Sequence, residues 1–431
     1  MARAKKEANL TPEERLQAAL VPDWEWPYKL PENWCWTYFK SISIIQTGKK
    51  DANYGSDEGK YPFFTCAAEP IRCHGYSFDC RAILLAGNGD INNISRYNGK
   101  FEAYQRTYVV KIAEPLCFDY IFYWFKYRWF DFNKGKMFGT AIPYIRLGNL
   151  QEFPTPIPPL VEQQRIVDRI ESLFAKLDES KEKAQAVLDS FETRKAAILH
   201  KAFTGELTKK WRKSANTRWV YKKIKDCCKL GSGGTPSRKV PDFYKGDIPW
   251  IKTGEIEWND IYDTEEKITQ SAIDNSSARC YKPGVVLVAM YGMGVTRGKA
   301  SILRVQAATN QAVCVLEPQS ALLYNRYLLY YFMRNYWDIR EKAVGGNQLN
   351  LSLTIIKELN IEIPPIDEQV EIVQILDDLF AKEQQTKEAA EAVLDQIDLM
   401  KKSILARAFR GELGTNDPSE ESAVELLKQL I

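Results

Sequence analysis

The chain has 431 residues, of which 45% are hydrophobic, 27% charged and 12% aromatic. These values are typical of globular proteins, and the length suffices for about two to four domains. No apolar run approaches the roughly 20 residues of a membrane helix, and the N-terminus lacks the apolar core of a secretory signal, so we expect a cytoplasmic protein with no membrane partner.

Charge is unevenly distributed, although the net charge is only +3. Residues 218–360 carry 20 Lys and Arg against 14 Asp and Glu, whereas residues 361–431 carry 7 against 16. Excesses of this size also occur on ordinary solvated surfaces, so charge alone does not predict nucleic-acid binding.

The nine cysteines are odd in number and scattered, which favours reduced thiols. Cys66, Cys73 and Cys80 lie seven residues apart, with His74 beside the middle one. Zinc sites usually contain closer C-x2–4-C pairs, so this spacing favours buried thiols, and we predict no metal site.

A long segment of the chain occurs twice. IPPLVEQQRIV at 157–167 returns as IPPIDEQVEIV at 363–373, and AILHKAFTGEL at 197–207 returns as SILARAFRGEL at 403–413. The offset of 206 is far too long for a solenoid repeat, and so many identities at one offset indicate a duplication.

Each copy is predicted to be one long helix of about 43 residues, which corresponds to a rod of roughly 65 Å. A Pro-Pro pair precedes each helix, and Gly205 or Gly411 follows it as a C-terminal cap. Apolar residues at 3–4 spacing form a narrow seam, typical of helices that pair with each other. The seam includes Ile166, Ile170, Ala184 and Ala202 in the first copy, and Ile372, Leu376, Ala390, Val393 and Ile397 in the second.

The blocks before the helices also correspond. Trp36–Gly48 aligns with Trp219–Gly231 at an offset of 183, and the aromatic stretch 116–126 aligns with 322–332 at 206, so the second block is 23 residues longer. The aromatic helix expected over Phe118–Phe132 favours core packing over base stacking. We predict five parts: an N-terminal segment with a short helix (1–32), a first variable block (33–156), a first helical spacer (157–213), a second variable block (214–360), and a second helical spacer with the C-terminal tail (361–431).

Residue sets for catalysis are missing. YGMGVTRGKAS at 291–301 departs from a phosphate-binding loop at Met293 and Ala300, and the two IPP segments lack the asparagine of amino-methyltransferases. With only His74 and His200, histidine chemistry is poorly supplied. We therefore predict no catalytic residues and no cofactor in this chain.

The duplicated IPPxxEQxxI…LFAK…AFxGEL helices, together with LPENWCW (30–36), GSGGTPSR (231–238), ATNQAVC (308–314) and GGNQLNLSL (345–353), closely resemble the specificity subunits of type I restriction–modification enzymes. The resemblance covers nearly all of residues 11–431. It implies an α/β (mixed α+β) fold with a pseudo-two-fold internal repeat, in which two target recognition domains are separated by two long helices that form an antiparallel coiled coil.

The resemblance also implies function. Each recognition domain would read one half of a bipartite double-stranded DNA site, and the helices would carry two DNA methyltransferase (modification) subunits that use S-adenosylmethionine. Restriction/translocase subunits that use ATP and Mg²⁺ would complete the enzyme, in a bacterial or archaeal cytoplasm at the nucleoid. A fixed gap between two half-sites needs a rigid spacer, which fits the two helices.

Candidate DNA-binding residues follow from the chemistry of base and phosphate contacts, which favours Arg, Lys, Asn, Gln and small residues that let the backbone approach the DNA closely. Ordinary turn chemistry is an equally good explanation of any one of them. In the first block they are Asn88, Asp90, Asn92, Arg96, Tyr97, Asn98, Lys100, Gln105 and Arg106. In the second block they are Gly233, Gly234, Thr235, Ser237, Arg238, Lys252, Tyr291, Gly292, Met293, Thr296, Arg297, Lys299, Asn347 and Gln348.

Two other interpretations stay open. The chain could be a coiled-coil scaffold that organises partners without reading DNA, which a gel shift with genomic fragments would distinguish. It could also be a free-standing nuclease or methylase, which an assay of the pure chain would reveal.

Overall fold

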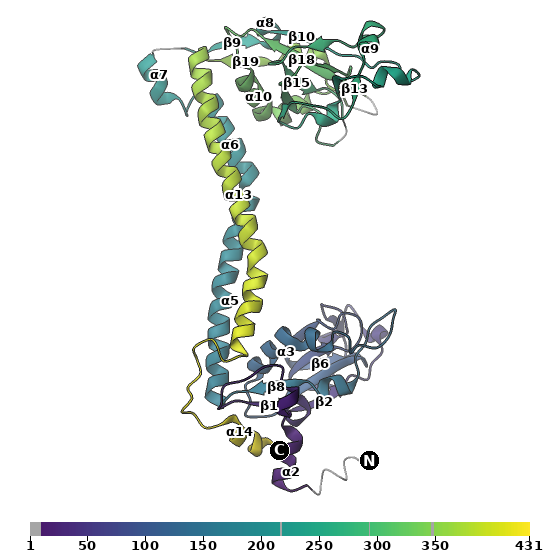
Figure 1. Ribbon diagram of the computed structural model, residues 1–431, viewed down its shortest axis with the longest axis vertical. Helices are drawn as coiled ribbons and strands as arrows, with labels where there is room; N and C mark the ends of the chain where they lie inside the picture. The colour runs from purple at the N-terminus through teal and green to yellow at the C-terminus, as the bar shows by residue number, and fades with distance from the viewer. Residues whose placement is uncertain (1–9, 216–217, 293, 346–348) are drawn as a thin grey trace. The chain divides into compact units, whose positions relative to one another are not determined.

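The computed structural model describes residues 10–215, 218–292, 294–345 and 349–431, which form two compact units (Figure 1). Unit 1 combines Met1–Ala184 with Ala392–Ile431, and unit 2 comprises Gln185–Glu391. Among the described residues, no helix combines the length and the apolar character that crossing a membrane requires.

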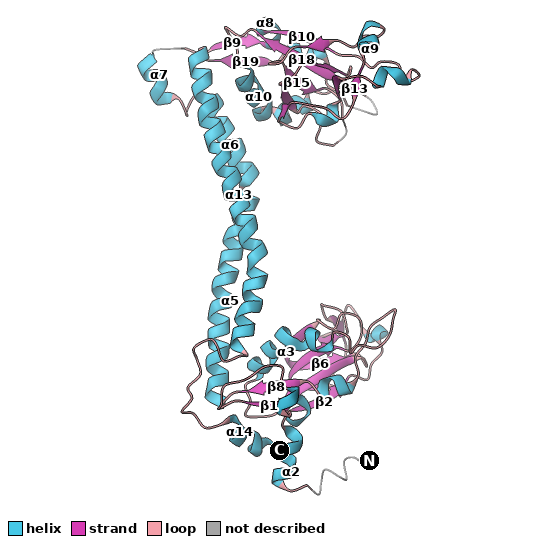
Figure 2. Ribbon diagram, viewed as in Figure 1, coloured by secondary structure: helices cyan, strands magenta, loops and turns pink. Residues whose placement is uncertain are grey.

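Unit 1 contains a six-stranded sheet in the order β2-β7-β5-β6-β3-β4 and a two-stranded sheet β1-β8 (Figure 2). Its strands are β1 (Cys35–Tyr38), β2 (Ser43–Thr47), β3 (Tyr61–Phe64), β4 (Ile71–Cys73), β5 (Phe78–Ala86), β6 (Ile94–Ala103), β7 (Thr107–Ile112) and β8 (Pro154–Ile157). Its helices are α2 (Pro12–Ala19), α3 (Phe118–Asn133), α4 (Leu147–Gln151), most of α5 (Leu160–Asp189), the end of α13 (Ile366–Ala408) and α14 (Ala423–Leu430).

Unit 2 contains a five-stranded sheet β10-β18-β15-β16-β12, a four-stranded sheet β13-β11-β17-β14 and a two-stranded sheet β19-β9. The strands are β9 (Val220–Lys223), β10 (Cys228–Ser232), β11 (Ile248–Ile251), β12 (Asp260–Ile261), β13 (Lys267–Ile268), β14 (Cys280–Tyr281), β15 (Val286–Ala289), β16 (Ala300–Leu303), β17 (Ala307–Thr309), β18 (Val313–Pro318) and β19 (Asn360–Ile363). In addition to part of α13, its helices are α6 (Phe191–Phe203), α7 (Lys209–Ala215), α8 (Ile224–Cys227), α9 (Gln270–Asp274), α10 (Asn325–Arg334), α11 (Tyr336–Glu341) and α12 (Leu353–Lys357).

The duplication is visible in the two-stranded sheets, which correct the alignment of the variable blocks. Cys35 pairs with Ile157, and Val220 pairs with Ile363. Because the two isoleucines are equivalent at offset 206, Cys35 and Val220 are equivalent at 220 − 35 = 185, not 183. Trp219 therefore corresponds to Trp34 rather than Trp36. The motif LPENWCW contains two tryptophans, Trp34 and Trp36, and the predicted alignment used the wrong one. The second block is therefore longer by 206 − 185 = 21 residues, not 23.

The aromatic helix α3 is a core element, as predicted, and its counterpart α10 is one as well. Tyr120 and Trp124 of α3 are fully buried, and Tyr120 donates a hydrogen bond to the carbonyl of Pro156 at 2.9 Å. In α10, Tyr327 likewise donates to the carbonyl of Glu362 at 2.8 Å. Tyr120 and Tyr327 are 207 residues apart, so the aligned aromatic stretches differ from the predicted offset by one residue.

The repeated Glu-Gln pair holds each unit together at the start of its long helix. The buried Gln163 accepts from the backbone N–H of Cys117 at 2.9 Å and donates to the carbonyl of Pro158 at 3.0 Å. Gln369 does the same with Tyr324 (2.8 Å) and Pro364 (2.8 Å). The glutamine thus fixes the helix to the beginning of the aromatic helix, which explains why both copies keep it.

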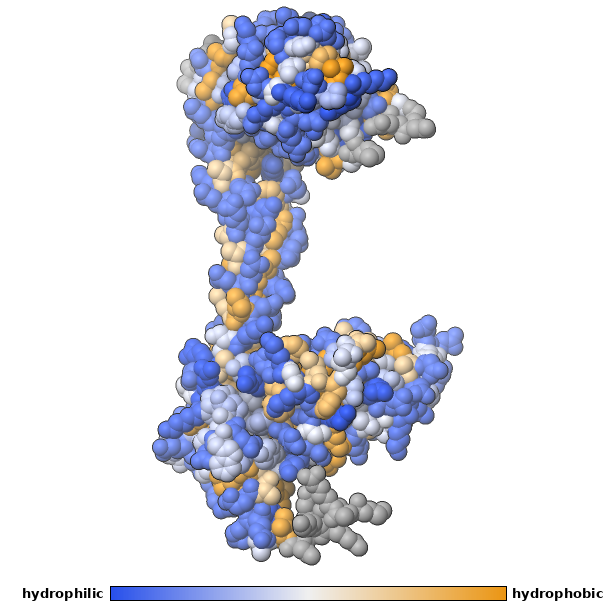
Figure 3. All heavy atoms as spheres, turned by 45° about the vertical axis from the view of Figure 1, so that its right-hand side comes forward, coloured by the Kyte–Doolittle hydropathy of each residue, from blue (hydrophilic) through white to orange (hydrophobic). Residues whose placement is uncertain are grey.

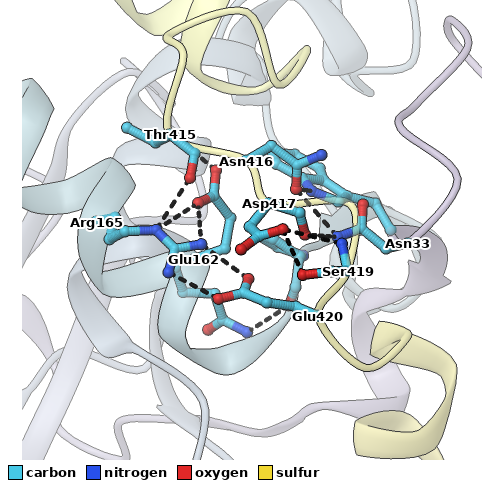
Figure 4. Close-up of polar contacts among 11 residues, drawn as sticks. Asn33, Glu162, Arg165, Thr415, Asn416, Asp417, Ser419 and Glu420 are labelled. Carbon is cyan, nitrogen blue, oxygen red and sulfur yellow. Dashed lines mark hydrogen bonds and ion pairs between the residues drawn. The ribbon is translucent and has the colours of Figure 1, made fainter.

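The neighbouring glutamate joins each helix start to the end of the other copy. Glu162 is fully buried and accepts from Thr415 at 2.7 Å and Arg165 at 3.0 Å, and Arg165 also reaches Glu420 (Figure 4). Burial raises the pKa of the Glu162 carboxyl, while the hydrogen bonds from Thr415 and Arg165 act in the opposite direction.

Glu368 has the same role in unit 2. This fully buried carboxylate accepts from the Thr208 hydroxyl at 2.7 Å and from Arg212 at 2.9 Å. Thr208 lies just beyond the first AFxGEL segment and Thr415 just beyond the second, so each glutamate binds a threonine beyond the end of the other copy's helix.

The long helices lie antiparallel within each unit. In unit 1, Asp178 of α5 contacts Lys401 of α13 at 2.5 Å, and Arg165 donates to the carbonyl of Thr415, beyond the end of α13. In unit 2, Arg194 of α6 contacts Glu383 of α13 at 2.8 Å. Gly205 and Gly411 end the two copies with φ of 72° and 74°, the left-handed cap that the sequence predicted.

The first copy is not the single helix expected from its sequence, because α5 stops at Asp189 and α6 starts at Phe191. Ser190 donates its hydroxyl to the carbonyl of Ala186 at 2.7 Å, a contact that bends helices. The second copy is continuous over 43 residues. Most seam positions are buried or half-buried, but Val393 is 41% exposed, so the predicted seam is wrong there.

The cysteine thiols near His74 make main-chain contacts. Cys73 is buried and donates to the carbonyl of Gly75 at 3.0 Å, whereas Cys66 donates to the carbonyl of Arg106 at 3.5 Å. All nine cysteines are free thiols.

Candidate nucleic-acid interface

Four loops of unit 2 lie at one edge of its five-stranded sheet. The end of β10 pairs with the start of β18 at Ser232 and Cys314, and the end of β15 pairs there at Ala289 and Val313. The backbone of Leu351 donates to the carbonyl of Met290 at 2.9 Å and brings in a fourth loop. We call the described residues of these loops, 233–240, 290–292, 294–299, 310–312, 344–345 and 349–351, loop cluster 2.

Unit 1 repeats this arrangement. Thr47 at the end of β2 pairs with Tyr108, and Ala86 at the end of β5 pairs with Thr107. The backbone of Ile145 donates to the carbonyl of Gly87 at 2.9 Å, which matches the Leu351 contact because 351 − 145 = 206. Loop cluster 1 therefore consists of residues 48–51, 87–93, 104–106 and 138–145, although the first block lacks the glycine-rich sequence motifs of the second.

Five of the nine residues predicted in the first block belong to loop cluster 1: Asn88, Asp90, Asn92, Gln105 and Arg106. Gln105 donates to Asp51 at 2.7 Å. A hollow of about 320 Å³ opens beside it, lined by Thr47, Gly87, Gln105, Arg106, Tyr108 and Ile145. Arg106 is exposed and, like the exposed Lys49, makes no ion pair within the described ranges.

The other four predicted residues of this block lie along β6. Arg96 forms an ion pair with Asp119 of α3 and stacks on the Phe122 ring at 4.7 Å. Tyr97 packs on Phe64, with ring centroids 5.3 Å apart. Lys100 lies 4.9 Å from the Tyr76 ring, and Asn98 is exposed. The structure therefore does not bring these four side chains together with the loops.

The glycines of the second block have a packing role. A Cβ on Gly233 would lie 1.7 Å from the carbonyl oxygen of Thr309, and one on Gly234 would lie 2.2 Å from Ser277 Oγ. Gly48, at the equivalent place in unit 1, is confined in the same way by Ala103 at 1.8 Å. The N–H of Gly234 donates to Thr309, so this group is already used within the protein.

Most cations predicted in the second block are ion-paired. Arg238 contacts Glu266 through two hydrogen bonds of 2.7 and 3.1 Å, and the same hydrogen-bonded guanidinium lowers the pKa of Glu266. Lys252 lies 3.3 Å from Glu265. Lys299 forms an ion pair with Glu257 and is only 12% exposed.

Arg297 connects two loops of cluster 2. Its guanidinium donates to the carbonyl of Leu349, while its own carbonyl accepts from Arg340. Tyr291 is 41% exposed in the same loop, Thr296 is half-buried, and Gly292 has a φ of 142°. Thr235 and Ser237 are exposed in the first loop. Met293, Asn347 and Gln348 lie outside the described residues.

Sequence reasoning missed Gln311 and Lys49. Gln311 is exposed in the turn before β18 and pairs with Thr235. It lies 206 residues after Gln105, so both clusters present a glutamine at the same position of the same turn. Applying the helix offset of 206 residues to Gln105, which was already a candidate, would have identified Gln311.

The family model described as type I restriction modification DNA specificity domain matches the chain twice, over residues 31–189 and 216–394. The chain belongs to this family. It is therefore a DNA-sequence-recognition subunit of a type I restriction–modification system, and the scaffold interpretation is not favoured.

Known relatives agree with this assignment. The EcoDI specificity subunit of Escherichia coli is 27% identical over 414 residues, which cover 89% of this chain and 90% of that protein. The EcoKI specificity subunit of E. coli K12 is 26% identical over 292 residues, 64% and 61% of the two chains. The HsdS subunit from Thermoanaerobacter tengcongensis shares the fold, with a TM-score of 0.63 at 18% identity over 90% of this chain and 100% of that one.

Proposed function

We propose that loop clusters 1 and 2 each contact one half of a bipartite site in double-stranded DNA. The observation that carries this proposal is the equivalence of the two clusters: the same strand ends of a duplicated frame present different polar side chains. A subunit with two such surfaces can read two sequences with one architecture, and the distance between its surfaces sets the gap between half-sites.

The chemistry of the clusters suggests roles for individual side chains. Lys49 and Arg106 are exposed cations that make no ion pair with any described residue, and they suit phosphate contacts. Gln105 and Gln311 carry amides that can bind an adenine edge through two hydrogen bonds. Arg297, Tyr291 and Thr296 remain candidates for base contact in the second half-site.

We propose that α5, α6 and α13 form one antiparallel coiled coil that spaces the recognition domains. The antiparallel contacts inside each unit support it, as do the reciprocal glutamate contacts at both helix starts. Four residues inserted near Glu182 and four near Glu388 lengthen each helix by about 6 Å. At about 3.4 Å per base pair, the gap in the target should grow by about two pairs, with both half-sites unchanged.

Two DNA methyltransferase subunits and the restriction/translocase subunits are the proposed partners. The long helices expose apolar residues that a partner could cover, including Leu399 and Met400, and Figure 3 shows hydrophobic residues at the helix surface. We assign methyl transfer with S-adenosylmethionine, and cleavage with ATP and Mg²⁺, to those partners in the cytoplasm, and no catalytic step to this chain.

The test is methylome sequencing of the host with and without this gene. A single bipartite adenine motif should disappear with the gene, and restoring the gene should restore it. The pure chain with S-adenosylmethionine should transfer no methyl group. A contiguous motif, or methyl transfer by the chain alone, would contradict the proposal.

A further inference from the structure

The outer edge of β1 is covered by the chain's own N-terminal segment. The backbone N–H of Val21 donates to the carbonyl of Trp36 at 3.0 Å, and Leu20 forms an antiparallel bridge with Thr37. Thr37 also donates its hydroxyl to the carbonyl of Ala19 at 2.8 Å. Residues 19–21 therefore add a short antiparallel strand to the sheet β1-β8.

This cover buries β1 almost completely. Trp36 is 1% exposed and Cys35 7% exposed. The indole N–H of Trp36 donates to the carbonyl of Tyr28, and the two rings pack edge to face at 5.1 Å. The C-terminal tail completes the cover, since Asn416 accepts from the indole N–H of Trp34 at 3.1 Å.

No described residue covers the equivalent strand β9 of unit 2 in this way. Tyr221 corresponds to Trp36 and is 74% exposed, and Val220 corresponds to Cys35 and is 47% exposed. Among the described residues, none hydrogen-bonds the main chain of Tyr221 on the side away from β19. The indole nitrogen of Trp219, the counterpart of Trp34, is buried and has no hydrogen-bond partner in the part of the chain that the structure describes.

Charge indicates what would fit this edge. Arg218 and Lys222 flank it, and neither takes part in an ion pair within the described part of the chain. The segment that covers the matching edge in unit 1, residues 11–32, carries five Asp and Glu against two Lys and Arg. An acidic segment with apolar residues in alternation would complement a basic edge with exposed Val220 and Tyr221.

We propose that β9 is a docking edge for an acidic, extended segment of a partner protein, which adds to the sheet β19-β9 as an antiparallel strand. Main-chain pairing with Tyr221 supplies binding, and side chains over Val220 and Tyr221 supply selectivity. The unpaired Trp219 indole N–H would gain an acceptor, as Trp34 has in unit 1. The inference rests on the proposed function, because the modification subunit is the partner that brings the segment.

A second copy of this chain is the less suitable occupant. Its own residues 19–21 already pair with its own β1, and the contacts of Ala19, Val21 and Tyr28 would have to break before they could pair elsewhere. An exposed edge with unpaired main-chain groups also invites non-specific association, which a bound partner prevents.

The experiment compares amide hydrogen exchange of the full chain alone and in complex with its co-expressed modification subunit. Exchange in residues 218–224 should slow on complex formation, whereas residues 34–38 should be protected in both states. Protection of 218–224 in the chain alone, with a dimeric mass, would assign the edge to a second copy and overturn the proposal.

Variants sharpen the result. In β1 the carbonyl of Trp36 faces away from β8, and the N–H of a strand residue points to the same side as its carbonyl. Because Tyr221 is the counterpart of Trp36, the N–H of Tyr221 faces away from β19. Tyr221→Pro therefore blocks the edge without breaking the ladder to β19, and should weaken partner binding about tenfold. Tyr221→Ala keeps the N–H and should weaken binding less. Unchanged exchange in residues 359–364 would show that the sheet is intact.

Charge reversal tests the acidic partner. Lys222→Glu with Arg218→Glu should weaken binding and reduce its salt dependence, whereas Lys282→Glu, an exposed lysine of the same unit, should do neither. If an active complex forms while residues 218–224 exchange as before and Tyr221→Pro binds normally, the docking edge is refuted and the proposed function stands. If no complex forms and no bipartite motif is methylated, both fail.

Discussion

Loop cluster 1 and loop cluster 2 leave the same ends of equivalent strands, but their arginines differ in availability. Arg106 in cluster 1 has no carboxylate partner among the described residues, whereas Arg238 in cluster 2 is held by Glu266. The lysines do not divide in this way, because Glu257 holds Lys299 whereas Lys239, like Lys49, makes no ion pair within the described residues. The duplicated frame therefore fixes where polar side chains can lie, and the loops alone decide whether a cation there is free to meet a phosphate.

This difference implies that recognition is modular. Replacing residues 218–360 by another second block of the family should change one half of the target completely and leave the other half intact. The reason is that loop cluster 1 shares no loop with the exchanged block. Methylome sequencing of a host with the hybrid is the measurement, and a change in the first half-site would refute modularity.

The frame could be predicted from the sequence much better than the contacts. The duplication, the helix caps at Gly205 and Gly411 and the buried aromatic helices all follow from local patterns that tertiary packing reinforces. The break at Ser190 was not predictable from periodicity, because one hydroxyl that bonds to the Ala186 carbonyl leaves the apolar spacing unchanged.

The candidate site was harder to predict from the sequence, because the type of a residue does not reveal which residue it contacts. Arg96 and Arg106 look alike in the sequence, but Asp119 holds the first and no described carboxylate holds the second. Gly233 and Gly234 looked like phosphate-binding glycines, yet close packing against Thr309 and Ser277 explains them. Only the three-dimensional neighbours separate these cases.

The helix starts offer a comparison in stability. Glu368→Ala should lower the unfolding free energy of unit 2 by about 2 kcal/mol, because Thr208 and Arg212 both lose their carboxylate. Glu162→Ala should cost unit 1 only about 1 kcal/mol, since Arg165 keeps Glu420. Urea titration followed by hydrogen exchange in each unit measures both. Equal losses would show that Glu420 does not compensate, and the Gln variants, which keep an acceptor, should lose less.

Arg297 tests base reading in cluster 2. Arg297→Ala should weaken DNA binding by about 1–3 kcal/mol if the side chain reads a base, with relaxed selectivity in the second half-site only. Its contact with Leu349 adds a structural role, and Arg297→Lys helps to separate the two roles, because lysine keeps the charge and can reach a guanine but lacks the planar guanidinium that donates to the Leu349 carbonyl. Competition binding with half-site mutants is the measurement, and an equal loss on random DNA would mean a phosphate contact.

The smallest expected effect bears most directly on the difference between the clusters. Arg106→Ala should reduce the slope of log K against log salt by about one, because an unpaired cation that meets a phosphate releases about one counterion. Arg238→Ala should change the slope much less, since Glu266 already neutralises its charge in the free protein. Affinity for one specific duplex, measured between low and physiological salt, gives both slopes.

Glu266→Gln provides the converse experiment. Glutamine keeps an oxygen that can accept from Arg238 but carries no charge, so nothing neutralises the guanidinium, and Arg238 then resembles Arg106 of cluster 1 in carrying a free charge. The salt slope should become steeper by up to about one, and binding to random DNA should strengthen with it. If Arg238→Ala and Arg106→Ala reduce the slope equally, DNA must displace Glu266 from Arg238, and the ion pair then holds the arginine in position until the duplex arrives.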